Sequence, residues 1–189
     1  MSPRLDIART RADFEAIVAL QRANHASAVA SERHGSEGFV YARHDAELLQ
    51  RFAAYLPQVI VRDPDGQIVG YTLAMPVQLR DSVPELTPMF EQFERLPYRG
   101  RPISQWTYFV GGQICVAPAW RGKGLLAALY SESARLAGSA MQLCVTEVAL
   151  RNEVSLRAHH RLGFLPVGRY RDDHEQWEVL AWPLPAASP

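Results

Sequence analysis

The stretch Ile114-Cys-Val-Ala-Pro-Ala-Trp-Arg-Gly-Lys-Gly-Leu-Leu-Ala-Ala-Leu-Tyr130 decides the fold of this chain. It opens with apolar, mainly β-branched residues up to Val116, which favours a strand. Pro118 ends that strand, because proline has no N–H to donate to a sheet. A basic loop with two glycines follows, and residues 125–136 carry Leu and Ala at helical spacing. The stretch therefore predicts a strand, a basic glycine loop and a helix in that order.

This order of elements predicts a site for an anion. The first N–H groups of a helix have no partner within the helix, and the positive end of the helix dipole lies there. Gly122 and Gly124 lack a Cβ, so the oxygens of a ligand can approach the backbone closely. Arg121 and Lys123 add positive charge to the loop. The expected ligand is a phosphate or a pyrophosphate.

Three kinds of phosphate site compete for this loop. A P-loop requires glycine at position 117 and Ser or Thr at position 124, but the chain has Ala117 and Gly124. A dinucleotide fingerprint matches residues 122–127, with Glu147 downstream. The first glycine of that fingerprint should directly follow the strand, which here ends five residues earlier, and too little chain remains for such a sheet.

The third kind fits best, because the segment resembles motif A of the GNAT superfamily, the acyl-CoA-dependent N-acyltransferases. That motif reads Gln/Arg-x-x-Gly-x-Gly/Ala at a strand-to-helix turn. Arg121, Gly124 and Leu126 occupy its three specified positions. Leu126 departs from the expected Gly or Ala, which affects the approach to a pyrophosphate but leaves the backbone donors in place. The alternative for such a turn on its own is an ordinary solvated loop.

A second segment, residues 151–164, resembles the same superfamily. It is similar to the GNAT pattern Asn-x-x-Ser-x-x-x-Tyr-x-x-x-Gly-Phe. The matching positions are Asn152, Ser155, Gly163 and Phe164. The position that usually holds Tyr holds His159. The two motifs occur in the order and at the spacing of the family, and the resemblance covers residues 58–75 and 106–182.

The resemblance implies a mixed α/β (α+β) fold: a mostly antiparallel sheet, splayed at its two central parallel strands, with helices on both faces. In GNAT folds the pantetheine arm of the cofactor enters the gap between those strands. Residues 1–189 then form one domain, and we expect residues 183–189 to be a frayed tail. Residues 78–105, which carry four prolines, interrupt a sheet hairpin, and we expect them to form a lid or wall on the acceptor side.

The resemblance also implies which residues bind acetyl-CoA. Backbone groups of residues 114–116 contact pantetheine, the turn 122–127 surrounds the pyrophosphate, and Asn152 contacts the cofactor from the next helix. The cofactor-binding residues expected in this way are Ile114, Cys115, Val116, Arg121, Gly122, Lys123, Gly124, Leu125, Leu126, Ala127 and Asn152. No metal is expected, because the scattered histidines have no metal-ligand spacing.

The expected catalytic residues are Glu147, His159 and Val116. An amine attacks a thioester only when it is neutral, so a base should accept its proton, and Glu147 occupies a position that some family members use for this purpose. The Val116 N–H would stabilise the oxyanion, and His159 would protonate the departing thiolate. The alternatives are a structural carboxylate in a strand and a helix histidine that is hydrogen-bonded at the edge of the core.

The rest of the chain predicts alternating helices and strands. Helices are expected over residues 14–24, capped by Asp13, 45–55, 89–96 and 153–162, capped by Asn152. Strands are expected over residues 5–8, 59–61, 68–75, 106–116, 143–148, 164–170 and 177–182. The pair Gly111-Gly112 predicts a bulge or bend within its strand.

Composition narrows the classes of protein and partner. The formal net charge is zero, which argues against a nucleic-acid partner, and no apolar run is long enough to span a membrane. Cys115 and Cys144 both lie in apolar runs and predict reduced, buried residues of a cytoplasmic protein. The sequence does not fix the oligomeric state and is compatible with a homodimer.

The sequence therefore predicts an N-acetyltransferase that moves an acetyl group from acetyl-CoA to a primary amine by direct attack in a ternary complex. The acceptor is a small molecule or a protein amine, and the sequence does not choose between them. A rival from another class is a non-catalytic acyl-CoA-binding or regulatory domain on the same scaffold.

Overall fold

The stretch that opens with Ile114 folds as a strand, a turn and a helix in the computed structural model, which describes residues 2–185. Strand β6 (Tyr108–Val116) leads through a 3-10 turn, η5 (Pro118–Trp120), into helix α5 (Leu125–Ala137). The chain then returns as β7 (Leu143–Ala149), which lies parallel to β6. The predicted order of strand, glycine loop and helix is thus confirmed, and so are the two parallel strands at the centre of the sheet.

Seven strands form one sheet in the order β1-β2-β3-β6-β7-β9-β8. Apart from the parallel pair β6 and β7, all neighbours in this sheet are antiparallel. The other strands of the sheet are β1 (Arg4–Ile7), β2 (Val59–Arg62), β3 (Ile68–Met75), β8 (Leu165–Arg171) and β9 (Gln176–Pro183). This arrangement confirms the fold class that the sequence predicts.

The two central strands diverge soon after they start. They pair only where Tyr108–Val110 faces Leu143–Val145. Just past the last pair, β6 carries a bulge: Leu73 of β3 pairs with Gln113 and Ala74 pairs with Gly111, so Gly112 has no partner there. The bend predicted from the two glycines is therefore confirmed. It lies where the gap between β6 and β7 opens.

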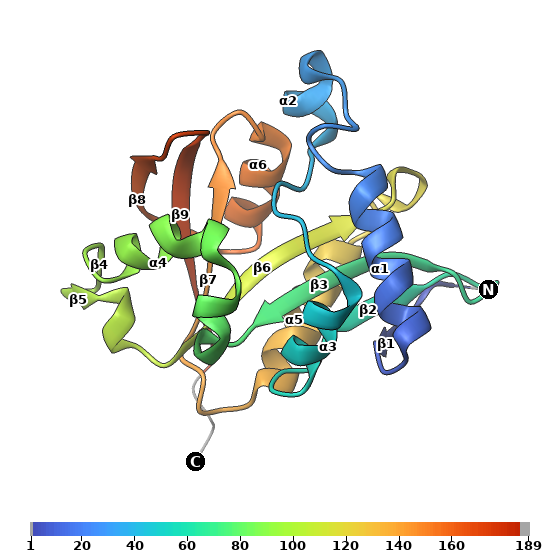
Figure 1. The fold of residues 1–189 in the computed structure, drawn as a ribbon, viewed down its shortest axis with the longest axis horizontal. Coiled ribbons are helices and arrows are strands. Elements are labelled where there is room, and N and C mark those ends of the chain that lie inside the picture. The colour runs from blue at the N-terminus through green and yellow to red at the C-terminus, as the bar shows by residue number, and fades with distance from the viewer. Residues whose placement is uncertain (1, 186–189) are drawn as a thin grey trace.

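Helices cover both faces of the sheet, as Figure 1 shows with α1 and α3 in front and α5 behind. The largest apolar cluster buries side chains of α1 (Arg11–Ala23), α3 (Ala46–Ala53) and α4 (Thr87–Phe93) against one face. Two smaller clusters bury α5 and residues next to α6 (Glu153–Arg161) against the other. None of the helices in residues 2–185 is both long and apolar enough to cross a membrane.

Two helix caps differ from the prediction. Helix α1 is capped by Thr10, whose hydroxyl accepts from the Asp13 N–H, while the Asp13 carboxylate accepts from the Thr10 N–H in return. Asp13 therefore belongs to the first turn and is not the cap. Asn152 does precede α6, but its side chain makes no capping hydrogen bond. Its amide donates instead to the Phe39 carbonyl, on a distant segment.

The segment inserted between β3 and β6 is part of the core. It contains η2 (Val77–Ser82), η3 (Pro84–Leu86), α4, the short strands β4 (Pro97–Tyr98) and β5 (Arg101–Pro102), and η4 (Ile103–Gln105). Met89, Phe90 and Phe93 of α4 are buried in the largest cluster. The segment is thus a packed wall and does not form a loose flap.

The start of the predicted frayed tail is ordered. Strand β9 runs through Pro183, and the Leu184 N–H donates to the Gln142 carbonyl at 2.9 Å. Residues 186–189, the rest of that predicted tail, lie outside the described residues.

Candidate functional site

A cavity of about 680 Å³ opens where β6 and β7 separate. Its floor comes from the two strands. Its walls come from the chain between α1 and α3, the insertion, the turn between β8 and β9, and residues of α5, β9 and the start of α6 with His159. The lining segments are residues 110–114, 146–149, 25–27, 39–43, 83–86 with 88–89, and 172–174. The insertion therefore provides a wall of this cavity.

The glycine loop before α5 has the geometry of an anion site. Gly122 and Gly124 have positive φ angles of 72° and 76°, and a Cβ added at either would meet no heavy atom within 4 Å. The first helical hydrogen bond runs from the Ala128 N–H to the Gly124 carbonyl at 3.2 Å. The N–H groups of the three residues before Ala128 thus have no partner within the helix. Open space and free donors coincide at this turn.

The two cations of the loop point in different directions. Lys123 is exposed, with its Nζ 4.5 Å from the centre of the Trp120 ring. Arg121 is half-buried and turns inward, where its Nε donates to the Val116 carbonyl at 2.9 Å. Its two terminal nitrogens donate to the Glu37 carbonyl at 2.6 Å and to the Asn24 Oδ1 at 2.8 Å. Lys123 is therefore the cation of the loop that stays exposed at the turn.

The edge of β6 that faces the gap has backbone groups that make no hydrogen bond to β3. The Ala117 N–H donates to the Val69 carbonyl of β3 at 2.8 Å. Because hydrogen-bonding direction alternates along an antiparallel pair, Val116 and Ile114 point their N–H groups away from β3. Ile114 lines the cavity and Val116 does not. The amide of Ile114 thus lies closer to the cavity than that of Val116, which the sequence suggested as the oxyanion donor.

The backbone of Cys115 faces β3, unlike that of Ile114 and Val116, and its side chain packs in the core. Its side chain is buried in the largest apolar cluster, and burial raises the pKa of its thiol to about 12. A thiol with such a pKa holds its proton at neutral pH and is a poor nucleophile. The environment of Cys115 agrees with the core packing expected from its apolar run.

Glu147 of β7 lies on the cavity beyond the point of divergence. Its Oε2 accepts a hydrogen bond from the Tyr170 hydroxyl of β8, and its Oε1 accepts none from the residues that the structure describes. Burial raises the pKa of this carboxyl to about 8, the negative charge of Asp172 adds to the rise, and the hydrogen bond from Tyr170 opposes it. A carboxyl with this pKa suits proton transfer near neutral pH.

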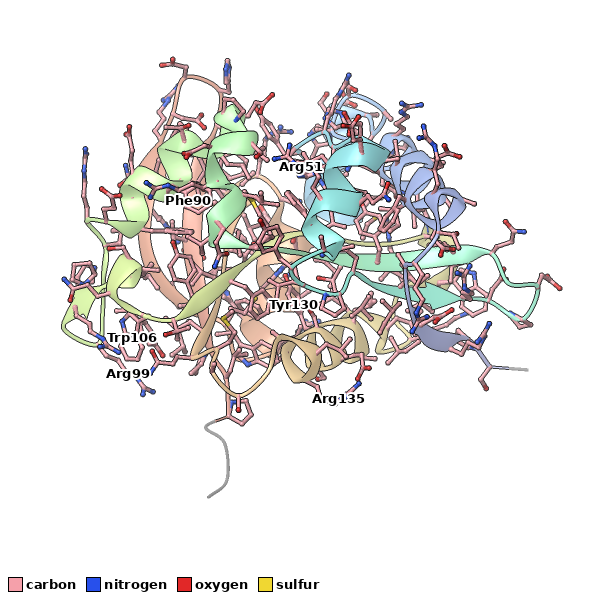
Figure 2. The ribbon with its side chains drawn as sticks, turned by 60° about the horizontal axis from the view of Figure 1, so that its bottom comes forward. Arg51, Phe90, Arg99, Trp106, Tyr130 and Arg135 are labelled. Atoms are coloured by element: carbon pink, nitrogen blue, oxygen red, sulfur yellow. The ribbon has the colours of Figure 1, made fainter. Side chains whose placement is uncertain are left out.

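His159 is buried, with 2% of its surface exposed. Its Nδ1 lies 2.8 Å from the Ser155 carbonyl, which can only accept, so this nitrogen carries the proton. Its Nε2 lies 2.8 Å from the Tyr130 hydroxyl and therefore accepts from it. Figure 2 shows Tyr130 projecting inward from α5, away from the exposed Arg135 of the same helix.

This environment disfavours the predicted acid role of His159. Burial lowers the pKa of the imidazole to about 4, so the ring is neutral at pH 7. The one proton of the neutral ring is already donated to a backbone carbonyl. The geometry fits the alternative, a paired histidine that holds the Tyr130 hydroxyl at the wall of the cavity.

Asn152 lies at the cavity, but its amide is partly engaged. Its Nδ2 donates to the Phe39 carbonyl at 2.8 Å. Its Oδ1 is buried and has no hydrogen-bond partner among residues 2–185. A contact between Asn152 and a cofactor stays a prediction.

Sequence reasoning missed two polar residues of the site. Tyr170 is two strands away from Glu147 in the sheet, so its contact depends on the β7-β9-β8 order. Gln113, next to the bulge, accepts from the Tyr71 hydroxyl at 2.5 Å and donates to the Ala42 carbonyl at 2.8 Å. Alternating strand patterns carry no signal for either contact.

Comparisons with known proteins give the family of the chain and the relatives of its fold. The profile of the acetyltransferase (GNAT) family matches residues 26–164. No curated protein has significant sequence similarity to the chain.

Solved structures share the fold. The ribosomal-protein-S18-alanine N-acetyltransferase from Escherichia coli has a TM-score of 0.65 at 13% identity, covering 98% of this chain and 96% of its own. A phosphinothricin acetyltransferase from Sinorhizobium meliloti, in complex with AcCoA, has a TM-score of 0.59 at 20% identity, covering 97% and 89%. The yncA protein from Salmonella typhimurium, with its cofactor acetyl-CoA, has a TM-score of 0.60 at 17% identity, covering 100% and 98%. At these identities the likeness is one of fold.

Proposed function

The chain belongs to the acetyltransferase (GNAT) family, and we propose that it transfers an acetyl group from acetyl-CoA to a primary amine by direct attack in a ternary complex. The observation that carries this proposal is the position of Glu147. A carboxyl with a pKa of about 8 and one free oxygen lies at the cavity between the splayed strands. A protein that only binds acyl-CoA has no need for such a base.

Acetyl-CoA would lie along the edge of β6. The pyrophosphate accepts hydrogen bonds from the free N–H groups at the start of α5, and Lys123 adds a positive charge. The pantetheine amides pair with the outward backbone groups of Val116 and Ile114, as a further strand would. This direction brings the thioester toward the bulge at Gly112 and the cavity.

The transfer itself needs a base and an oxyanion donor. The amine nitrogen attacks the thioester carbon, and its proton passes to Glu147, directly or through one water. The negative charge on the former carbonyl oxygen is stabilised by a backbone N–H, and we assign this role to Ile114, which lines the cavity. Val116, two residues farther along β6, would contact the pantetheine.

Collapse of the tetrahedral intermediate breaks the C–S bond and releases the thiolate of CoA. An ordinary thiol has a pKa of about 8.5, so the thiolate leaves with little help. His159 has no proton to supply at pH 7, and we propose that the thiolate takes its proton from water. His159 then serves to position the Tyr130 hydroxyl.

The chemistry of the cavity favours a cationic acceptor. The carboxylates of Glu85, Asp172 and Asp173 line it beside Glu147, whose raised pKa leaves it mostly neutral at pH 7, against one guanidinium among the described lining residues, that of Arg43. An ammonium ion is attracted to this lining and loses its proton before attack, whereas an acceptor with an extra carboxylate is repelled. Small amines and protein amines both meet this requirement.

A panel of small amines and peptides incubated with acetyl-CoA tests the proposal. We expect release of CoA thiol and an acetylated product with at least one cationic amine. Binding of acetyl-CoA by calorimetry, with no acetylated product for any amine between about pH 7 and 10, would instead favour the non-catalytic alternative.

A further inference from the structure

The chain between α1 and α3 forms a strap, residues 24–43, across the front of the sheet (Figure 1). Its two ends are held together: the Ala26 N–H donates to the Val40 carbonyl at 2.9 Å, and the Val40 N–H donates to the Asn24 carbonyl at 3.0 Å. The short elements η1 (Ser31–Arg33) and α2 (His34–Glu37) lie between these ends. Eight residues of the strap line the cavity.

The strap is fastened to the sheet and α6 from outside by polar side chains. Asn152 donates to the Phe39 carbonyl, and Gln113 donates to the Ala42 carbonyl, each at 2.8 Å. These two bonds hold the half of the strap that returns toward α3. Arg151 contacts the His34 Nδ1 and Arg157 donates to the Gly35 carbonyl at 3.5 Å, so the start of α2 is also held from the side of α6, while the chain just after α1 and the end of α2 are bound by a further group.

Arg121 is that group. Its guanidinium reaches the Asn24 side chain, just after α1, and the Glu37 carbonyl, at the end of α2. Asn24 is oriented for this bond, because its Nδ2 donates to the Leu20 carbonyl and leaves Oδ1 to accept. The third bond, to the Val116 carbonyl, ties the same guanidinium to the end of β6.

All three nitrogens of the guanidinium are thus occupied by neutral oxygens of the protein. The side chain is half-buried, while Gly122, Lys123 and Gly124 beside it are exposed. The guanidinium has five N–H groups and three of them are used in this way, so a pyrophosphate would be limited to the two that remain unless these bonds were broken. Lys123, by contrast, is exposed at the turn, where it lies over an aromatic ring.

We propose that Arg121 is a positioning residue for the acceptor amine: it clamps the strap to the cofactor turn and shapes the acceptor side of the cavity. The inference rests on the proposed function in one respect, that the cavity receives the acceptor. It assigns the two cations of one loop to different substrates, Lys123 to the cofactor and Arg121 to the acceptor.

Three variants separate these roles. Arg121→Lys keeps the positive charge but cannot bond in three directions from one planar group. Asn24→Ala removes one partner of the clamp from the strap side and leaves the cofactor turn untouched. Lys123→Gln is the matched control, because it removes a cation of the same loop whose contact in the described part of the chain is the Trp120 ring and not the strap.

Hydrogen exchange of peptides covering residues 24–43 reports the clamp without any need for turnover. Losing a hydrogen bond to a charged group corresponds to about tenfold or more in an equilibrium. We expect Arg121→Lys and Asn24→Ala each to speed exchange in the strap about tenfold, with the combined variant little faster than either alone. Lys123→Gln should leave the strap unchanged. Thermal unfolding of each variant shows whether the fold is retained.

Kinetics then locate the effect. With the best amine, Arg121→Lys and Asn24→Ala should raise the amine KM about tenfold, with the acetyl-CoA Kd within about twofold of wild type. Lys123→Gln should weaken the binding of acetyl-CoA and leave the amine KM unchanged. A folded Arg121→Lys protein with a wild-type strap and weaker acetyl-CoA binding would overturn the inference. Absence of turnover in wild type would overturn the proposed function. Hydrogen exchange of residues 24–43 would still show whether Arg121 clamps the strap.

Discussion

The hydroxyl of Tyr170 provides the sharpest test of the proposed base. Tyr170→Phe deletes one oxygen and with it the hydrogen bond to the Glu147 carboxylate. That bond stabilises the ionised form and opposes the effect of burial on the pKa. Without it the pKa of Glu147 should rise further above about 8. The ionised base is then present only at higher pH, so turnover at neutral pH should fall.

The size of this fall follows from the bond that is lost. A hydrogen bond to a charged group contributes about 1.5–3 kcal/mol, which equals a pKa change of about one to two units. With a pKa of about 8, about one tenth of the Glu147 population is ionised at pH 7. After the substitution this fraction becomes about 1% to 0.1%, and kcat/KM at pH 7 should fall about 10- to 100-fold.

The assay is release of CoA thiol as a function of pH, with one amine, for wild type, Tyr170→Phe and Glu147→Gln. The acceptor also loses a proton as the pH rises, and Glu147→Gln records that contribution alone. Dividing the pH profiles of wild type and Tyr170→Phe by the profile of Glu147→Gln leaves the pH dependence that arises from the Glu147 carboxyl. Thermal unfolding of Tyr170→Phe separates a local change from a loss of structure.

In wild type, we expect the part of the pH profile that arises from Glu147 to have its midpoint near pH 8. In Tyr170→Phe this midpoint should move to higher pH, and turnover should recover toward the wild-type value at alkaline pH. The same midpoint in both proteins would refute the assignment of this part of the profile to Glu147. A downward shift would mean that the Tyr170 hydroxyl stabilises the neutral carboxyl rather than the ionised one, which would refute the proposed effect of this hydrogen bond on the base.

Five further predictions concern binding, catalysis and stability. Gly124→Val, which places a β-branched residue at a φ of 76°, should weaken acetyl-CoA binding at least about tenfold by calorimetry while circular dichroism shows a retained fold; unchanged affinity would move the pyrophosphate elsewhere. His159→Gln should keep kcat within about fivefold of wild type at pH 8, below the usual value of general acid catalysis, and a loss of about 10²-fold or more would restore the acid role. The pKa of His159 is lowered to about 4, so its contribution to stability is complete above about pH 6.5 and is lost as the pH falls toward 4; the Gln variant should lose less stability over that range in urea titrations. The pKa of Glu147 is raised from 4.5 to about 8, so its contribution is complete below pH 4.5 and is lost as the pH rises through about 8; Glu147→Gln should therefore unfold at a higher temperature relative to wild type at pH 9 than at pH 4.5, and an equal difference at both would contradict the raised pKa. Phe93→Ala should destabilise the protein by about 3–5 kcal/mol in denaturant, since the side chain is fully buried in the main cluster, and a loss under about 1 kcal/mol would show that the insertion is not part of the core.

The elements that carry local signals are predictable from the sequence. The strand ending at Val116, the glycine turn and α5 follow from β-branched residues, proline, glycine and helical spacing, and the structure confirms each. The bulge at Gly112 is predictable for the same reason, because a pair of glycines weakens a strand. The cap of α1 carries a local signal too, but Thr10 and Asp13 are both good capping residues, and only the structure shows that they act as a reciprocal pair with the threonine as the cap.

Features that depend on distant contacts are beyond the sequence. Arg121 occupies a motif position, and from its charge alone one expects a phosphate ligand. Its actual partners on the strap lie far away along the chain, so the sequence gives no sign of them. The role of His159 depends on distant contacts in the same way: spacing places the ring on α6, but burial against Tyr130 lowers its pKa and disfavours the predicted acid role. Long-range hydrogen bonds and desolvation therefore limit what such a chain reveals about its site.

The most direct test of the central claim is the rate of acetyl transfer to one amine, measured as acetylated product at pH 8, for wild type and Glu147→Gln. We predict product from wild type and a decrease of about 10²- to 10⁴-fold in the variant, with acetyl-CoA affinity unchanged in calorimetry. Equal rates for the two proteins would contradict the assignment of Glu147 as the base, and absence of product from wild type with every amine, despite tight acetyl-CoA binding, would contradict catalysis itself.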